Sequence, residues 1–236
     1  MSELFVAGYG DIAEAGFPDV LCPVIFLEGC NFKCPFCLNY RLVTGENIKK
    51  IPIDFIINKY KKKKEKKILI SGGEPLYNDK IYELISVLKE NGFSVRISTN
   101  GSFPDVLEKL INLKMVSFVA MDVKTGWCDL RKWDIVSDQS YVFHNILKSI
   151  EILNKKNVDY EYRTTLFPGL VDANDLLSIA QKIDKDSNWF LQPFRMKAKL
   201  LGGNFIGKIK PYEEEEIQKF LNLARQNIKN TRIRDV

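Results

Sequence analysis

Short apolar segments alternate with amphipathic segments along most of this 236-residue chain. Apolar side chains recur with the 3.6-residue period of a helix within 81–88, 106–111, 142–153 and 176–183. Strands that alternate with helices form a parallel sheet through right-handed crossovers. We therefore expect an α/β chain, either a partial barrel or an open doubly wound sheet. The six predicted strands are Val24–Glu28, Lys67–Ser71, Ser94–Ser98, Ser117–Val123, Asp159–Leu166 and Trp189–Phe194.

Glycine, polar and charged residues gather where these predicted strands end. In both candidate folds the carboxyl ends of the strands meet at one edge, where binding sites form. We therefore expect these residues to lie at a common rim. They are Gly29 and Cys30, Gly72 to Glu74, Ser98 to Gly101, Asp122 and Lys124, Arg163 to Thr165, and Gln192 to Arg195.

Three cysteines follow the first predicted strand with the spacing C-x3-C-x2-C: Cys30, Cys34 and Cys37. A loop of this length can direct three thiolates at one centre. Three thiolates can hold three irons of a [4Fe–4S] cube, whereas an electron-transfer cluster usually takes four cysteines. The fourth iron would then be open to an external ligand, as catalytic metals keep an open position. Structural zinc is the rival interpretation, and it needs a fourth cysteine or histidine.

The remaining candidates for that fourth ligand lie far away in the sequence. We interpret Cys22 and Cys128 as structural thiols, and His144, the single histidine, as a packing or surface residue on an amphipathic helix. An odd number of cysteines, five in all, also argues against a disulfide framework. Trp127 and Trp133 fall in a stretch without clear periodicity, and they could line the rim or cover it.

The charge of the chain is concentrated in one place. Its net charge is +5, but the segment Lys59–Lys67 alone carries +6 and the remainder sums to −1. We interpret that segment as a solvated helix end, with a docking patch for an acidic protein as the alternative. A nucleic-acid partner is not expected from such a distribution. The acidic residues Glu213 to Glu216 are typical of the first turn of a helix, which we expect over about 212–228.

Chain length and hydropathy limit the possible domain organisation and cellular location. A chain of this size with 45% hydrophobic residues suits a single domain over 1–236. No apolar run approaches the ~18 residues of a membrane span, and the first residues lack the pattern of a secretion signal. We therefore expect a cytoplasmic protein with no membrane contact.

Two motifs together resemble a known family. The segment C-x3-C-x-aromatic-C, with Phe36 as the aromatic residue, and the later Gly-Gly-Glu-Pro at 72–75 resemble the radical S-adenosylmethionine (SAM) superfamily. The resemblance spans about 24–195 and implies a partial (β/α)6 barrel of the TIM type. Further likeness to glycyl-radical-enzyme activases, and among them to anaerobic ribonucleoside-triphosphate reductase activating proteins, lies in Phe26–Asn39, Ser98–Gly101, Met121–Lys124, Arg163–Gly169 and Leu191–Arg195.

The resemblance implies a role for each rim residue. The cysteines would hold a [4Fe–4S] cluster whose fourth iron chelates the amino and carboxylate groups of the methionine moiety of SAM. The cluster ligands and catalytic residues would be Cys30, Cys34 and Cys37. The residues implied to bind SAM are Phe36, Gly72, Gly73, Glu74, Ser98, Thr99, Asn100, Asp122, Lys124, Arg163 and Arg195.

These implied roles have a physical sense. Phe36 would offer a flat apolar face to the adenine. Gly72 and Gly73 would let backbone groups approach the methionine amine, and Glu74 would fix that turn. The hydroxyl and amide groups of residues 98–100 suit the ribose.

The charged residues would serve the other groups of the cofactor. Lys124 and Arg163 suit its carboxylate, and Asp122 would join a polar or cation-binding cluster beside the sulfonium. Simpler interpretations remain open: residues 72–75 could form an ordinary turn, Asp122 and Lys124 a strand-end ion pair, and Arg163 a satisfied interior cation.

Two positions depart from the family pattern. Pyruvate formate-lyase activases carry an aspartate at the position of Ser98, where it helps to bind a monovalent cation. Asp122 is left alone here, so that cation is not predicted. Arg195 stands where some relatives carry histidine.

The implied activity is reductive cleavage of SAM to methionine and a 5′-deoxyadenosyl radical. That radical would generate a glycyl radical on a partner enzyme, of the anaerobic ribonucleotide reductase type, with reduced flavodoxin or ferredoxin as electron donor. One alternative is a radical SAM enzyme that acts on a small molecule, such as a 7-carboxy-7-deazaguanine synthase. Another is an iron–sulfur electron carrier, which would have no use for the rim residues.

Overall fold

A curved β-sheet forms the centre of the fold. The computed structural model describes residues 4–11, 21–62, 66–139, 142–196, 200–203 and 209–234. An eight-stranded sheet has the order β10-β9-β8-β7-β6-β5-β3-β2, and a two-stranded ribbon pairs β1 with β4. The strands are β1 (Phe5–Val6), β2 (Gly8–Gly10), β3 (Val24–Leu27), β4 (Ile51–Pro52), β5 (Lys67–Gly72), β6 (Ser94–Thr99), β7 (Phe118–Asp122), β8 (Asp159–Leu166), β9 (Asn188–Pro193) and β10 (Thr231–Ile233).

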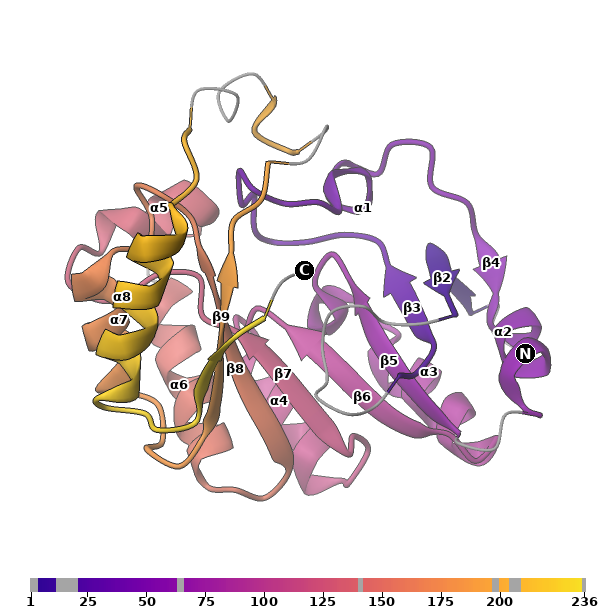
Figure 1. Cartoon of the computed structure of the whole chain (residues 1–236). Helices are drawn as coiled ribbons and strands as arrows, with labels where there is room; N and C mark the ends of the chain where they lie inside the picture. Colours follow the sequence, from indigo (N-terminus) through magenta and orange to yellow (C-terminus); the bar gives the residue numbers. More distant parts are fainter. Residues whose placement is uncertain are drawn as a thin grey trace.

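Helices connect successive parallel strands. Figure 1 shows α3, α4, α6 and α7 along the outer side of the curved sheet. The helices are α1 (Tyr40–Thr44), α2 (Ile53–Tyr60), the 3-10 turn η1 (Pro75–Tyr77), α3 (Ile81–Glu90), α4 (Pro104–Asn112), α5 (Arg131–Val136), α6 (Val142–Asn154), α7 (Ala173–Ala180) and α8 (Glu214–Arg225).

The predicted α/β fold is confirmed, and each of the six predicted strands is present within about two residues at either end. β3, β5, β6, β7, β8 and β9 are parallel neighbours in chain order, as in a TIM-type barrel. The structure adds β2, antiparallel to β3, and β10, parallel to β9. Each has only three residues, too few for a recognisable alternating pattern. Among the described residues β2 and β10 do not pair, so the barrel is open on that side.

Burial follows the sequence pattern. The central strand β7 has three consecutive buried residues, Val119 to Met121, because helices cover one of its faces and the barrel interior the other. The helix α4 begins with Pro104, whose missing N–H costs nothing at that position. Its side chains at Leu107, Leu110 and Ile111 are buried against the sheet.

The predicted ends of two charged helices are confirmed. Lys59 lies in the last turn of α2, and the helix ends at Tyr60, so the lysine-rich segment begins at the end of the helix and continues beyond it. Residues 63–65 of that segment lie outside the described residues. At α8, the side chains of Glu213 and Glu216 form a capping box. Among the described helices, none is both long and apolar enough to cross a bilayer.

Candidate active site

A cavity of about 260 Å³ opens at the carboxyl ends of the parallel strands. It combines the thiols of the cysteine loop with residues from β5, β6, β7, β8 and β9, as the pattern of strand ends predicts. Thirteen of the fourteen predicted site residues line it, all except Glu74. The complete lining is Cys30, Phe32, Cys34, Phe36, Cys37, Leu38, Asn39, Ser71, Gly72, Gly73, Ser98, Thr99, Asn100, Asp122, Lys124, Arg163, Thr165, Gln192, Pro193, Phe194 and Arg195.

The cysteine loop leaves β3 and folds back on itself. The amide of Cys37 donates to the carbonyl of Cys34 over 3.0 Å, which closes a turn around Pro35. The amide of Gly202 donates to the carbonyl of Pro35 over 2.9 Å, so the segment 200–203 packs against the same turn. These bonds hold the loop against the cavity although the loop contains no regular secondary structure.

Burial of the three cysteine thiols affects their pKa values. It raises the pKa of Cys30 and of Cys34 to about 12, and it raises the pKa of Cys37 as well. Iron binds the thiolate form, so loading a metal here displaces protons. Among the described residues no three histidine, cysteine, aspartate or glutamate side chains converge on a single ion. A cube-shaped cluster does not require such convergence, because each thiolate binds a different iron.

A charged group lies opposite the cysteines. Arg163 on β8 donates from Nε and Nη2 to the two carboxylate oxygens of Asp122 on β7, each over 3.0 Å. Its Nη2 also bonds to the hydroxyl of Ser98 on β6. Lys124 places its Nζ 3.3 Å from Asp122. The strand-end ion pair and the satisfied interior arginine are therefore both present.

The two neighbouring cations, Arg163 and Lys124, determine the direction of the pKa shift of Asp122. Burial by itself would raise the pKa of this carboxyl, but Arg163 and Lys124 together outweigh it and lower the pKa below the ordinary aspartate value. For Lys124, burial would lower the pKa, and the neighbouring Asp122 raises it instead. Lys124 has three N–H donors, and Asp122 is the ion-pair partner that the described residues provide.

Glu74 lies beneath the cavity and joins three segments. Its Oε1 accepts from the amide of Leu76 and the hydroxyl of Thr99, over 3.0 and 2.7 Å. Its Oε2 accepts from the amide of Asn100 over 2.6 Å. Glu74 is 1% exposed, and burial raises its pKa to about 7 in spite of these three donors. The predicted role in fixing the turn is therefore present, whereas the predicted contact with a cofactor lacks access.

The glycines before Glu74 are required by packing. A Cβ at Gly73 would overlap the carbonyl of Gly29 in the cysteine loop, and a Cβ at Gly72 would overlap the backbone of Leu27. Gly72 also has a φ of +127°, which disfavours other residues. This packing role is separate from the approach of a ligand predicted for both glycines. The structure shows that they allow β5 to lie close to β3 and its following loop.

The last part of the rim is polar and aromatic. The side chain of Asn100 donates to Asn31 over 3.1 Å and accepts from the hydroxyl of Ser102 over 2.6 Å. Phe36 packs on Phe167 with ring centroids 5.1 Å apart. The cavity therefore has one apolar wall beside its charged one.

A family model for the radical SAM superfamily matches residues 24–182, which is more than half of the chain. The chain belongs to the radical SAM superfamily. Members of this superfamily use a [4Fe–4S] cluster and SAM. The match includes the cysteine loop and the ends of β5, β6, β7 and β8.

Relatives of this radical SAM chain include more than one kind of enzyme. It is 33% identical, over 98% of its length and 96% of the relative's, to a Methanocaldococcus jannaschii protein provisionally named a glycyl-radical enzyme activating enzyme. It is also 28% identical to a 7-carboxy-7-deazaguanine synthase of Clostridium acetobutylicum, over 81% and 79% of the two lengths.

Solved structures agree on the fold. The crystal structure of Streptococcus suis SuiB bound to S-adenosylmethionine superposes with a TM-score of 0.61 at 16% identity, covering 88% of this chain and 48% of that one. A likeness at this identity concerns the fold alone.

The donor set of the radical SAM chain fits the superfamily's cofactors. Three thiols on a single loop line the cavity, and the aromatic ring of Phe36 and the ammonium of Lys124 lie 5.8 Å apart beside them. A sulfur-rich donor set selects an iron–sulfur cluster over harder metal sites. An apolar face next to charged groups suits a ligand with a flat base and a zwitterionic end.

Asn39 also lines the cavity, although no role for it was predicted from the sequence. Asn39 donates from its side chain to the carbonyl of Gly72 over 2.8 Å and so ties the cysteine loop to β5. Thr165 and Gln192 line the cavity from β8 and β9. Both were expected at the rim, because they stand at the ends of predicted strands.

The residues set aside in the sequence lie away from the cavity lining. Cys22 is buried with Val24 and Leu69, and His144 is exposed on α6. Trp133 is buried and donates from its indole to the carbonyl of Gly126 over 2.9 Å. Trp127 packs on Trp133, and Cys128 hydrogen-bonds at 3.6 Å to Asp175 on α7. Neither tryptophan is among the residues that line the cavity.

Proposed function

We propose that this radical SAM chain generates a glycyl radical on a partner enzyme of the anaerobic ribonucleotide reductase type. The observation that carries the proposal is the 33% identity to a protein provisionally named an activating enzyme, which extends over nearly the whole of both chains. The motif segments of the cysteine loop and of β6 to β9 resemble the same activases. Reduced flavodoxin or ferredoxin is the proposed electron donor.

The residues that would hold the cofactors are those of the cavity. Cys30, Cys34 and Cys37 would bind three irons of the cluster, and when bound, the cluster and SAM supply reductive cleavage to methionine and a 5′-deoxyadenosyl radical. Phe36 would support the adenine. Gly73 would present its backbone to the methionine end.

The hydrogen bonds that Arg163 and Lys124 already make indicate which of the two would bind the carboxylate of SAM. Arg163 already uses two of its three nitrogens on Asp122 and Ser98, so it orients Asp122. Lys124 has donors to spare and would bind the carboxylate. The hydroxyl of Ser98 would contribute a polar contact to the ribose, and Arg195 a contact at the edge of the cavity.

The first experiment is anaerobic reconstitution with iron and sulfide, followed by reduction and assay for 5′-deoxyadenosine. The Cys34→Ala variant is expected to lose the cluster and the product, whereas Cys128→Ser, which removes a thiol outside the cavity lining and keeps a hydrogen-bonding side chain there, keeps both. Equal loss in the two variants would contradict the ligand assignment. Absence of 5′-deoxyadenosine from a fully loaded, reduced protein would contradict the radical chemistry.

The second experiment separates the two candidate substrates. The identity to a 7-carboxy-7-deazaguanine synthase favours a small-molecule enzyme as the second candidate. An activase produces an electron paramagnetic resonance doublet of a glycyl radical on an added partner protein. A small-molecule enzyme forms product over many turnovers with no protein partner, and that result would replace the activase proposal.

A further inference from the structure

The end of the short helix α5 and the chain after it contact the cysteine loop. The carbonyl of Val136, at the end of α5, accepts from the amide of Lys33 over 2.7 Å. The side chain of Asn31 donates to Gln139 over 3.0 Å, and the ammonium of Lys33 pairs with Asp138. Since residues 31 and 33 lie between the ligands Cys30 and Cys34, α5 supports the loop where two of the thiols are placed.

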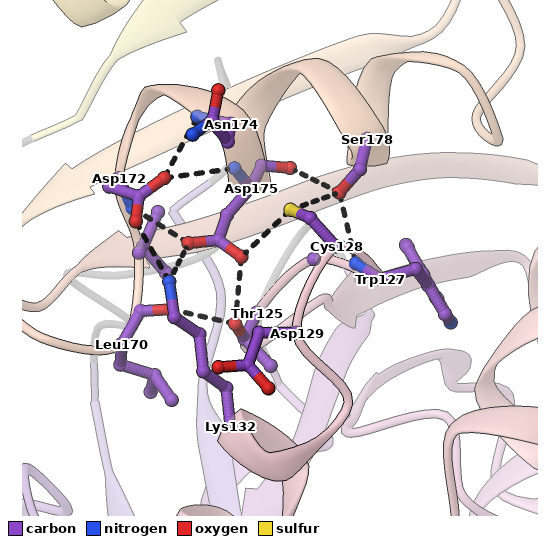
Figure 2. A network of polar contacts seen from close by, with 12 residues as sticks. Thr125, Trp127, Cys128, Asp129, Lys132, Leu170, Asp172, Asn174, Asp175 and Ser178 are labelled. Carbon is purple, nitrogen blue, oxygen red and sulfur yellow. Dashed lines mark hydrogen bonds and ion pairs between the residues drawn. The ribbon is translucent and has the colours of Figure 1, made fainter.

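The other end of α5 is anchored to α7 by a buried charge. The Nζ of Lys132 lies 2.9 Å from Asp172 and also bonds to Asp175 (Figure 2). Asp175 is fully buried, and its Oδ2 also accepts from the amide of Asp172 in the capping box of α7. Partial burial would lower the pKa of Lys132, but the two carboxylates raise it. The contact is therefore a charged one and not a chance approach of surface groups.

The chain between β7 and α5 contacts the same part of the structure as Lys132, at α7 and the residues before it. Thr125, the residue after Lys124, donates its hydroxyl to the carbonyl of Leu170 over 2.7 Å and lies 3.5 Å from Asp175 (Figure 2). The amide of Trp127 donates to the hydroxyl of Ser178 over 2.9 Å.

Packing leaves this segment little freedom. A Cβ at Gly126 would overlap Ser178 and the backbone of Asp175, and the carbonyl of Gly126 accepts from Trp133 on α5. The residues next to Lys124 are thereby fixed to α7 and to α5 together.

We infer that residues 125–139 form a strut that fixes the position of the cysteine loop relative to Lys124. Lys132 is the positioning residue of this strut. We call this segment the α5 strut. Its two ends support two parts of the lining of one cavity, the thiols of the loop and the ammonium of Lys124. Lys132 touches neither wall, so its influence passes through α5 and Thr125.

The inference rests on the cluster and SAM of the proposed function, but it does not depend on the identity of the partner. Its test therefore uses the full chain without any partner protein. Two measurements decide it: amide hydrogen exchange over 29–39 and 122–128, and the dissociation constant of SAM for the cluster-loaded protein.

The variant Lys132→Met removes the charge and keeps the length of the side chain. We expect faster exchange in both segments, unchanged exchange in β8, and SAM binding weakened by about 10-fold or more, as supporting residues affect metal sites. Lys132→Arg restores both readouts. The matched control Lys155→Met breaks the exposed ion pair with Glu108 and leaves both as in the wild type.

A gentler variant keeps the test decisive if Lys132→Met does not fold. Thr125→Val removes one hydroxyl at constant shape, and Thr125→Ser restores it. We expect faster exchange over 122–128 and weaker SAM binding in the valine variant. Wild-type exchange over 29–39 and wild-type SAM binding in a folded Lys132→Met, or wild-type values throughout in Thr125→Val, would overturn the inference. The exchange measurement needs no cofactor, so it decides the strut even if the wild type binds no SAM.

Discussion

Individual side chains beneath and beside the cavity determine how firmly its rim is held. Glu74 accepts hydrogen bonds from three protein donors, two amides and one hydroxyl. Asp122 is held between Arg163 and Lys124. Buried groups of this kind are costly when one partner is removed, because the remaining polar group is left unsatisfied.

Replacing Glu74 by glutamine tests the first of these groups. The amide would keep one acceptor oxygen, but its NH2 would face the N–H of Asn100, which needs an acceptor. We expect a loss of about 1–3 kcal/mol in the free energy of unfolding, measured by denaturant titration of the metal-free protein. Glu108→Gln, at a half-buried surface position whose ion pair with Lys155 is exposed, should change it by less than about 0.5 kcal/mol. A Glu74→Gln protein as stable as the wild type would contradict this account.

Replacing Asp122 by asparagine leaves two cations without their counter-charge, at a cost of about 3 kcal/mol near neutral pH. The pKa of Asp122 is lowered in the folded chain, so its contribution is complete above the ordinary value of 3.8 and is lost as the pH falls through the lower folded value. The difference between wild type and variant should therefore shrink below about pH 4. Urea titrations across the acid range measure it, with Asp186→Asn on an exposed pair as control. A difference that stays constant with pH would contradict this account.

At the scale of the elements, six strands of the sheet could be predicted from the sequence because short apolar or β-branched runs alternate with segments of helical periodicity, whereas the three-residue β2 and β10 could not. The rim could also be predicted, because the carboxyl ends of parallel strands must meet. The strut could not: α5 has six residues, and its anchor depends on Lys132 meeting Asp175 across more than forty residues. A local sequence pattern does not predict such a contact. It also does not show why residue 73 must be glycine.

Gly73→Ala tests the close approach of β5 to the cysteine loop. The added methyl group would meet the carbonyl of Gly29, which is backbone and cannot rotate away. We expect Gly73→Ala to lower both the melting temperature and the iron retained after reconstitution. Gly169→Ala is the matched control: it has a positive φ but nothing within 4 Å of the new methyl group. It should cost about 1–2 kcal/mol in stability and leave iron content unchanged. Full iron content in Gly73→Ala would show that the loop can move aside.

At the scale of the whole molecule, the last described strand adds a seventh parallel strand beyond the six predicted ones. β10 pairs with β9, and Arg234 after it lies against the ring of Phe190. The guanidinium of Arg234 also forms two bonds, 2.6 and 3.0 Å long, with the fully buried Glu161 on β8. The end of the described chain is therefore bonded to the middle of the sheet.

Arg234→Met should leave Glu161 charged and unpaired, with a loss of about 3–5 kcal/mol in the free energy of unfolding. The double variant Arg234→Met with Glu161→Gln should recover a large part of that loss, because the buried charge is gone. A double-mutant cycle measures the coupling. Additive effects of the two substitutions would show that the pair contributes nothing as a pair.

The α5 strut has a consequence for the order in which a growing chain becomes competent. The three cysteines are synthesised within the first forty residues, but the carbonyl that supports Lys33 belongs to residue 136, and the carboxylates that anchor α5 belong to residues 172 and 175. During synthesis from the amino end, the thiols therefore leave the ribosome long before the contacts that fix them. The cysteine loop is therefore synthesised early and supported late, and we expect cofactor insertion to follow folding of the chain through residue 175.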